Sequence, residues 1–273
     1  MENKPIIALM YDFDRTLSPK NMQEYAFIPG LGMDPASFWA KCDQAAKKYA
    51  MDDILAYMHV MLEESQGIQL VTKNTLRAIG AQVELFPGVD TWFDRINQRA
   101  EACGLAAEHY LISSGLREII EGTSIADRFT GIFASSFCCN DRGVPFWPAE
   151  AVNYTSKTQF LFRINKGVTD PSDRRLNEYM PAEKRRVPFS NMVYIGDGMT
   201  DVPCMKLTRV NGGHSIAVYE GEKKLVEKLL ADGRIDFGVP ADYSPQSPLE
   251  DAIFRIIDLV AAKEKLKDLE GCL

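Results

Sequence analysis

The chain has 273 residues, of which 46% are hydrophobic and 25% are charged, with a formal net charge of −7 and a pI near 5.2. This size suits one large core, or a core with a modest second domain, in an ordinary soluble globular protein. The acidic balance argues against nucleic acid or a membrane surface as the main partner, because both favour basic proteins. No apolar stretch approaches the length of a membrane span and no signal-peptide pattern is present, so we expect a cytoplasmic protein.

Cysteine and histidine are scattered along the chain. None of the six cysteines forms a CxxC pair, which favours reduced thiols over a disulfide, metal or redox role. The three histidines are too widely separated in the sequence to favour a zinc site. These residues are Cys42, Cys103, Cys138, Cys139, Cys204, Cys272, His59, His109 and His214.

Apolar runs of strand length recur, each followed by small or polar residues, and they are typical of parallel strands buried on both faces. Strands are predicted over residues 6–11, 110–112, 129–134, 192–195 and 215–219. Helices are predicted between them over residues 89–102, 116–121, 158–165 and 203–206. A last helix begins at Pro248, with Ser247 and Glu250 forming a capping box. This alternation predicts an α/β fold with a doubly wound parallel sheet, whose ligands bind at the carboxyl ends of the strands.

Two segments interrupt the alternation. Residues 19–85 contain almost no strand signal, and helices are expected to begin at Pro35, to include residues 51–62 and to cover residues 72–79. The methionines of this segment are expected to fill its core rather than to form a binding face. Residues 167–186 are polar with mixed charges, which favours a solvated surface loop over a substrate clamp.

Two acidic pairs follow predicted strands. Asp12 and Asp14 come after the first, and Asp197 and Asp201 lie in the sequence Gly-Asp-Gly-Met-Thr-Asp. The second pair has a spacing that faces one side if a helix begins there. Four neighbouring carboxylates repel one another unless a cation lies among them, and an all-oxygen site of this kind suits Mg²⁺.

A phosphate site is predicted beside the acidic pairs. Ser113 ends a predicted strand and is followed by Ser114 and a helical pattern, and a hydroxyl with free N–H groups at a helix start binds phosphate oxygens. A lysine is needed to balance the remaining charge. Lys157 is favoured, because Thr155 and Ser156 before it are suited to cap its helix. Lys166 lies at the other end of that helix and better suits the C-terminal dipole.

In this order, the Asp12–Thr16 motif, Ser113, Lys157 and the 196–201 motif resemble the haloacid dehalogenase superfamily, and most closely its phosphoserine phosphatase branch. The resemblance implies a Rossmann-like core over residues 1–18 and 86–273, a helical C1 cap over residues 19–85 and a polar insertion over residues 167–186 within the core. It also implies a Mg²⁺-dependent phosphatase that acts on a small phosphorylated metabolite.

The same resemblance implies roles for individual residues. Asp12 would be the nucleophile, and Asp14 would act as general acid and then general base. Mg²⁺ would bind Asp12, the backbone carbonyl of Asp14 and Asp197, with Asp201 supporting the metal and holding the lysine. Ser113 and Lys157 would hold phosphoryl oxygens, and the Ser114 N–H would add a donor.

Three points depart from the pattern or leave alternatives open. The branch has a glutamate at the position of Asn21, so phosphoserine is not supported as the substrate, and Glu24 is only the nearest candidate for that contact. Arg15 replaces a residue that is small in many relatives, and a structural role is favoured over steering of phosphate. A phosphomutase would use the same residues, and an inactive phospholigand-binding protein would use the same scaffold.

Overall fold

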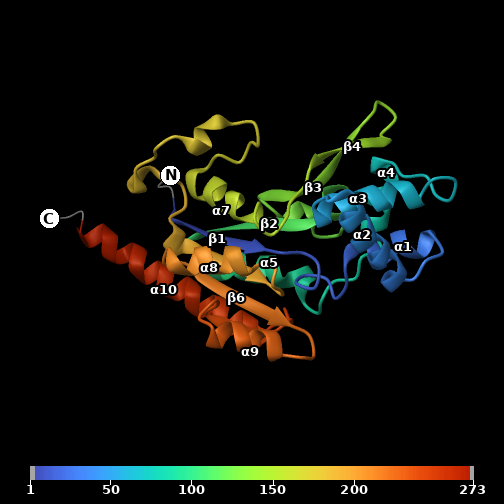
Figure 1. The fold of residues 1–273 in the computed structure, drawn as a ribbon. Helices are drawn as coiled ribbons and strands as arrows, with labels where there is room; N and C mark the ends of the chain where they lie inside the picture. The colour runs from blue at the N-terminus through green and yellow to red at the C-terminus, as the bar shows by residue number, and fades with distance from the viewer. Residues whose placement is uncertain (1–3, 271–273) are drawn as a thin grey trace.

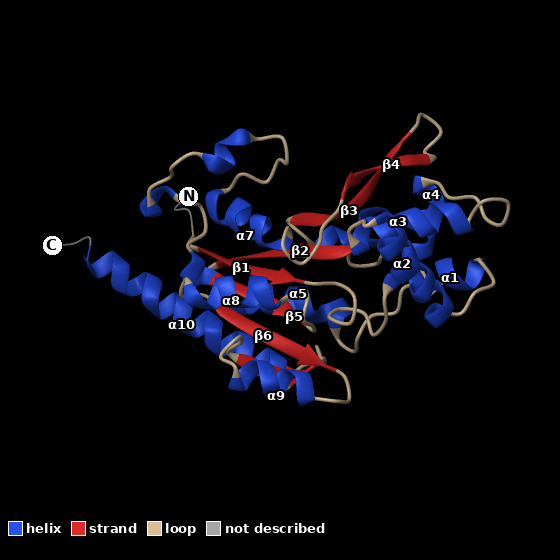
Figure 2. Cartoon of the chain, viewed as in Figure 1, coloured by secondary structure: helices blue, strands red, loops and turns tan. Residues whose placement is uncertain are grey.

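The computed structural model describes residues 4–270 and is built on a seven-stranded sheet of order β4-β3-β2-β1-β5-β6-β7 (Figures 1 and 2). Neighbouring strands are parallel except β3 and β4, which are antiparallel. The predicted α/β fold is therefore confirmed. The strands are β1 (Ile6–Tyr11), β2 (Ala106–Leu116), β3 (Gly131–Cys139), β4 (Pro145–Glu150), β5 (Met192–Gly196), β6 (His214–Tyr219) and β7 (Phe237–Pro240).

Helices pack on both faces of the sheet. The longer ones are α2 (Pro35–Tyr49), α3 (Asp53–Glu64), α4 (Lys73–Gly80), α5 (Val89–Ala102), α7 (Lys157–Lys166), α8 (Val202–Val210), α9 (Lys224–Ala231) and α10 (Pro248–Glu270). The short ones are α1 (Phe27–Gly30), α6 (Arg117–Ile120) and the 3-10 turns η1 (Met22–Glu24), η2 (Ala126–Arg128), η3 (Arg174–Asn177), η4 (Ala182–Lys184) and η5 (Phe189–Asn191).

Strand β1 separates two hydrophobic cores. Ile7, Leu9 and Tyr11 face the core built with α5 and α10, and Ala8 and Met10 face the core built with α7, α8 and α9. All five residues are fully buried, which explains the unbroken apolar run in the sequence. Polar residues appear only after the carboxyl end of the strand, beginning with Asp12.

The sequence-based prediction missed β4, β7 and α9. Both strands lie at the edges of the sheet and carry proline, with Pro145 and Pro148 in β4 and Pro240 at the end of β7. Edge strands tolerate proline because one side of their backbone pairs with no other strand, and they need no continuous apolar run. The pattern that revealed the central strands is therefore absent from them.

Residues 19–85, called the helical segment below, contain α1 to α4. The Asp34 side chain caps α2 by accepting a hydrogen bond of 2.9 Å from the Ser37 N–H. Met58 and Met61 are fully buried, so the expectation that the methionines fill a core is confirmed for these two. Their core is continuous with the core on the α5 and α10 face of the sheet. The assignment of this segment as a separate cap domain stays a prediction.

The last helix starts as predicted, but its capping box is incomplete. Ser247 Oγ accepts a hydrogen bond of 3.2 Å from the Glu250 N–H. The Glu250 carboxylate instead accepts from the Gln246 N–H at 2.6 Å and pairs with Arg95 at 2.6 Å. Glu250 therefore ties α10 to α5 rather than closing the box.

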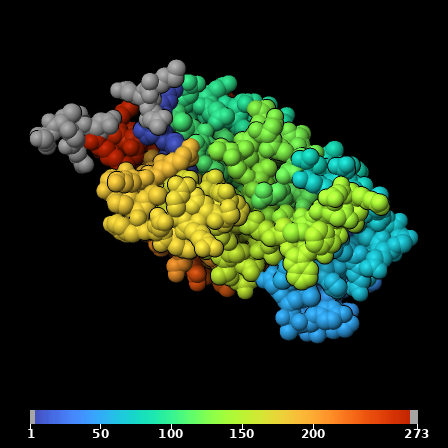
Figure 3. Space-filling model, turned by 90° about the horizontal axis from the view of Figure 1, so that it is seen from above, coloured from blue at the N-terminus to red at the C-terminus, as the bar shows by residue number. Residues whose placement is uncertain are grey.

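The polar insertion over residues 167–186 lies on the surface, where it is coloured yellow in Figure 3. It is nevertheless held by buried and charged side chains of the core. The buried Arg163 guanidinium donates to the Asp170 carbonyl at 2.8 Å, and Lys166 Nζ donates to the Leu176 and Glu178 carbonyls at 2.6 Å. At its end, Arg186 forms an ion pair with Glu108. The insertion is thus a tethered structure with two 3-10 turns.

Within residues 4–270, Cys42, Cys103, Cys138, Cys139 and Cys204 are free thiols, and Cys272 lies outside the described residues. None of the helices in this range is both long enough and apolar enough to cross a membrane.

Candidate active site

Three neighbouring central strands bring the predicted motifs together at the carboxyl ends of the parallel strands. Asp12 follows β1, Ser113 lies near the end of β2 and Asp197 follows β5, and β1 pairs with both of the other strands. The Asp12 N–H donates to the Ile195 carbonyl at 2.9 Å, which extends the pairing of β1 with β5 up to the first aspartate. The site is therefore built on rigid strand ends, as expected for this class of fold.

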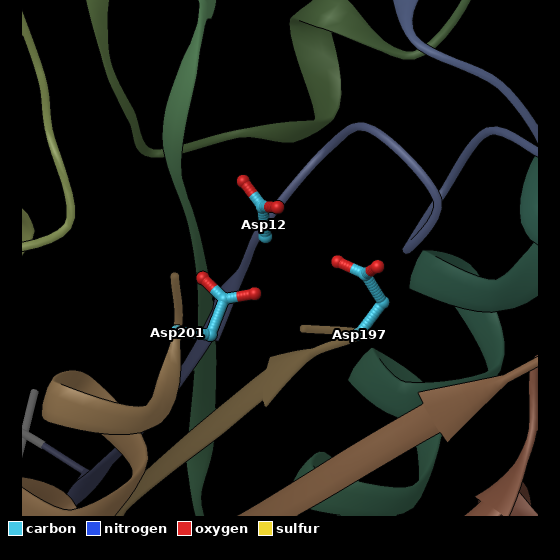
Figure 4. A group of neighbouring side chains, drawn as sticks. All are labelled: Asp12, Asp197 and Asp201. Carbon is cyan, nitrogen blue, oxygen red and sulfur yellow. The ribbon is translucent and has the colours of Figure 1, made fainter. Parts of the chain in front are cut away.

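A cluster of three carboxylates lies at these strand ends. Asp12, Asp197 and Asp201 each offer an oxygen, and these oxygens lie within 4.8 Å of one another (Figure 4). Asp197 and Asp201 would share one side of a helix only if a helix began between them, and α8 begins only at Val202. A turn instead joins the two, with the Asp201 N–H donating to the Gly198 carbonyl at 3.1 Å.

Lys157 is the cation of the cluster. Its Nζ atom lies 2.7 Å from Asp201 Oδ1 and 2.9 Å from Asp12 Oδ1, and its side chain is 1% exposed. Burial alone would lower the pKa of Lys157, but the two carboxylates raise it above its usual value, so the ammonium stays charged. Lys166, at the other end of α7, contacts the polar insertion instead.

Tyr194 and Gly196 also shape the cluster, although the sequence analysis did not select them. The Tyr194 hydroxyl donates to Asp201 Oδ1 at 2.8 Å. The Asp201 side chain lies so close to Gly196 that a Cβ at position 196 would stand 2.5 Å from Asp201 Oδ2. The alternation of β5 offered a signal, because Tyr194 and Gly196 point to the same face of the strand.

The cluster fits a divalent metal ion. The Asp201 Oδ2 atom is buried and has no hydrogen-bond partner in the structure. Three carboxylates against one ammonium leave a net charge of −2 when all are ionised. A hard cation that prefers oxygen ligands, such as Mg²⁺, would balance this charge.

Burial and neighbouring carboxylates raise the carboxyl pKa values of the site. Burial and the neighbouring Asp201 raise the pKa of Asp12 to about 6, although Lys157 opposes the shift. The same two causes raise the pKa of Asp197 to about 8. Burial and then Asp12 raise the pKa of Asp14 well above its usual value. These shifts are typical of carboxyl groups gathered at functional sites.

Asp14 lies outside the three-carboxylate cluster, beside Gly115 near the end of β2. Its Oδ1 accepts a hydrogen bond of 2.7 Å from the Met22 N–H, and a Cβ at Gly115 would lie 3.2 Å from its Oδ2. Ser113 is buried and its Oγ accepts from the Gly115 N–H at 3.0 Å. The strand does not end before Ser113 as predicted, because β2 continues to Leu116 with a shift in its pairing to β3.

The sequence analysis also singled out Ser114, Glu24 and Arg15, and the structure shows what each of them contacts. The Ser114 carbonyl accepts from the Tyr57 hydroxyl of α3 at 2.7 Å. Glu24 accepts from Asn21 at 2.6 Å and from the Trp39 indole N–H at 2.9 Å. Arg15 is exposed, has a left-handed φ of 58°, and lines a cavity of about 380 Å³ that also contacts Asp197.

The start of α7 is fixed by a residue that the sequence analysis missed. The Asn153 side-chain oxygen accepts from the Thr155 N–H at 3.0 Å and from the Ser156 N–H at 2.8 Å. The expectation that Thr155 and Ser156 cap the helix with their own side chains was wrong. Asparagine is among the residues that best satisfy free N–H groups at a helix start, which was the available signal.

Comparison with known proteins identifies the family. The family model of haloacid dehalogenase-like hydrolases matches residues 9–206, which is more than half of the chain. An uncharacterized protein of Borreliella burgdorferi is 29% identical over 287 aligned positions, covering 94% of this chain and 99% of that protein.

Solved structures share the fold. A probable phosphoserine phosphatase from Vibrio cholerae is 14% identical with a TM-score of 0.60, covering 96% of this chain and 67% of that one. A phospho-aspartyl intermediate analogue of phosphoserine phosphatase is also 14% identical, with a TM-score of 0.55 and coverage of 86% and 93%. With the family match over the residues that build the site, the chain belongs to the haloacid dehalogenase-like hydrolases.

Proposed function

We propose that this protein is a Mg²⁺-dependent phosphatase that hydrolyses a small phosphomonoester metabolite through an aspartyl-phosphate on Asp12. The observation that carries the proposal is the contact of Lys157 with both Asp12 and Asp201 beside Asp197. Phosphoryl transfer needs mainly alignment and neutralised charge, and this arrangement supplies a carboxylate nucleophile next to a fixed cation.

The proposed reaction has two steps. An Asp12 carboxylate oxygen attacks phosphorus, the bond from phosphorus to the alcohol oxygen breaks, and Asp14 gives its proton to the leaving alcohol. Asp14 then takes a proton from water, whose oxygen attacks the phosphorus and releases inorganic phosphate and the Asp12 carboxylate. The raised pKa of Asp14 supports the first of these roles, because it keeps the acid protonated before the transfer.

The remaining residues bind the phosphoryl group and the metal. Lys157, the Ser113 hydroxyl and the Ser114 N–H would hold phosphoryl oxygens. Asp12, Asp197 and the Asp14 carbonyl would hold Mg²⁺, and Asp201 would support the metal. The metal would neutralise the negative charge that gathers on phosphate and carboxylates.

The helical segment is proposed to act as a cap over this site. It already contacts the site's residues, since Met22 binds Asp14 and Tyr57 binds the Ser114 carbonyl. Structures named as phosphoserine phosphatases share the fold, but Asn21 lacks the carboxylate that phosphoserine recognition would use there. We therefore propose another small phosphorylated metabolite, and a cytoplasmic enzyme.

The test is hydrolysis of p-nitrophenyl phosphate in the presence of Mg²⁺ by the wild type and by Asp12→Asn. We expect the variant to lose at least about three orders of magnitude in kcat, because an amide cannot replace the nucleophile. Asp34→Asn is the matched control, since Asp34 caps α2 on the surface of the helical segment. Equal turnover by wild type and Asp12→Asn would exclude the proposal. In a second assay with sugar phosphates as substrates, products that carry the phosphoryl group on another sugar hydroxyl would identify a phosphomutase instead.

A further inference from the structure

Two side chains link the helical segment to the helix that carries Lys157. Asn153 lies before α7, and Asp52 lies before α3. We propose that the Asp52–Asn153 hydrogen bond is a positioning contact, through which the placement of the helical segment sets the position of the Lys157 ammonium. The proposal rests on the proposed function in that it assigns Lys157 to phosphate binding.

Asn153 organises the first turn of α7. Its side-chain oxygen accepts from the N–H groups of Thr155 and Ser156, and its carbonyl accepts from the Lys157 N–H at 2.9 Å. Ser156 Oγ completes the turn by accepting from the Asn153 N–H at 2.9 Å. These bonds fix the backbone of Lys157 relative to the Asn153 side chain.

Asp52 does the same for α3 and also reaches Asn153. Its Oδ1 accepts from the Ile54 N–H at 2.9 Å, and its Oδ2 accepts from Asn153 Nδ2 at 2.9 Å. Each side chain therefore caps its own helix with one atom and binds the other side chain with its second. A single hydrogen bond between residues 101 positions apart therefore joins the start of α3 to the start of α7.

Helix α3 makes a second contact, which reaches the end of β2. The Tyr57 hydroxyl donates to the Ser114 carbonyl, which also accepts from Ser135 Oγ at 3.1 Å. Ser135 Oγ in turn accepts from the Val152 N–H at 3.0 Å, one residue before Asn153. A movement of α3 would thus reach both the end of β2 at Ser113 and Ser114 and the start of α7.

The alignment of the Lys157 ammonium with its two carboxylates depends on the first turn of α7. Lys157 is the first residue of α7, and its Nζ bridges two carboxylates at 2.7 and 2.9 Å, so a small shift of the turn breaks one of these contacts. Misplacement of a catalytic group by about 1 Å costs up to about a hundredfold in rate. Binding of a substrate that fixes the helical segment against the core would then also fix the position of the Lys157 ammonium.

The test exchanges the two side chains. Asp52→Asn and Asn153→Asp each keep the oxygen that caps its helix, but they set two N–H groups or two carboxylates against each other. The double variant restores a hydrogen bond in the opposite direction. We expect each single variant to lose about tenfold in kcat for p-nitrophenyl phosphate, and the double variant to return to within about threefold of the wild type.

Hydrogen exchange gives a readout that does not depend on activity. Asp52→Asn changes only the helical segment, yet it should speed amide exchange at residues 155–160, and the double variant should slow it again. Asp34→Asn is the matched control, because it alters a cap of α2 that has no bond to Asn153 and should leave exchange at 155–160 unchanged.

The outcomes separate the two proposals. Unchanged exchange at residues 155–160 in Asp52→Asn, or a double variant no better than the single ones, would overturn the positioning contact. An inactive wild type would contradict the proposed function, and the exchange data would still decide whether the helical segment controls the start of α7.

Discussion

Lys157 Nζ lies 2.9 Å from Asp12 Oδ1, although the two residues are 145 positions apart in the chain. Both groups are buried. The attraction between two buried charges offsets the cost of removing them from water only when their contact geometry is good. The same ammonium lies 2.7 Å from Asp201 Oδ1, so one lysine links the motif after β1 to the motif after β5.

Removal of the lysine should affect both stability and activity. Lys157→Met leaves the carboxylates of Asp12 and Asp201 buried without their cation, and we expect a loss of about 3–5 kcal/mol in the free energy of unfolding. Activity on p-nitrophenyl phosphate should also fall by at least about a hundredfold. Urea denaturation and steady-state rates measure the two effects.

Lys166→Met is the matched control, because it removes a lysine from the other end of the same helix. It breaks hydrogen bonds to the Leu176 and Glu178 carbonyls, so the polar insertion should become more sensitive to protease. Its kcat should stay within about twofold of the wild type, since Lys166 has no contact with the carboxylate cluster. A loss of activity equal to that of Lys157→Met would contradict the assignment of the lysines.

Glycine at position 196 is expected to be essential. A Cβ there would lie 2.5 Å from Asp201 Oδ2 and 2.9 Å from Asp201 Cβ, so Gly196→Ala must displace the carboxylate that holds Lys157. We expect kcat to fall by about a hundredfold, because the geometry around the reacting group is lost. A Cβ at Gly198 would meet no atom within 4 Å, and Gly198→Ala should stay within about threefold of the wild type. Equal rates for the two variants would refute this account.

The metal-free protein should become less stable as the pH rises. Burial and Asp201 raise the pKa of Asp197 to about 8, whereas an aspartate in the unfolded chain titrates near about 3.9. Between these values the folded protein binds more protons than the unfolded chain, so the free energy of unfolding falls with increasing pH. In EDTA, Asp197→Asn should therefore gain in Tm relative to the wild type from about pH 4 to about pH 8.

Addition of Mg²⁺ at pH 8 should make the wild type melt at a higher temperature than Asp197→Asn. The cation stabilises the folded wild type by binding the ionised Asp197 carboxylate, and the variant does not have this ligand. Thermal melts with and without metal measure the difference. A Tm gap between the two proteins that does not change with pH would show that Asp197 does not titrate in this range.

Arg15 adopts a backbone conformation that favours glycine. Its φ is 58°, and left-handed geometry costs a residue with a Cβ roughly 1 kcal/mol. We expect Arg15→Gly to raise the free energy of unfolding by up to about 1 kcal/mol in urea denaturation. Arg15→Ala removes the charge but keeps the unfavourable backbone, so it should not share the gain. A change in KM common to both variants would instead reveal a role for the guanidinium in attracting substrate.

Much of the fold was predictable from local pattern. The continuous apolar runs at residues 6–11 and 192–195 mark central strands buried on both faces, and these strands were confirmed within one residue. The edge strands β4 and β7 escaped prediction, because a strand paired on one side tolerates proline and exposed residues. The helical nature of residues 19–85 was likewise visible in the spacing of its apolar residues.

The residues that could carry the chemistry were predictable from the sequence, since Asp12 and Asp197 follow strands, Ser113 lies near the end of a strand and Lys157 begins a helix. Which of these residues come into contact depends on how the chain folds. The folded chain places Lys157, which the sequence already favoured over Lys166, beside Asp12. It alone brings Asp201 against Gly196 and joins Asp52 to Asn153. The reason is physical: local pattern records burial and hydrogen-bonding needs along the chain, whereas contacts across 100 residues depend on how the sheet and helices pack.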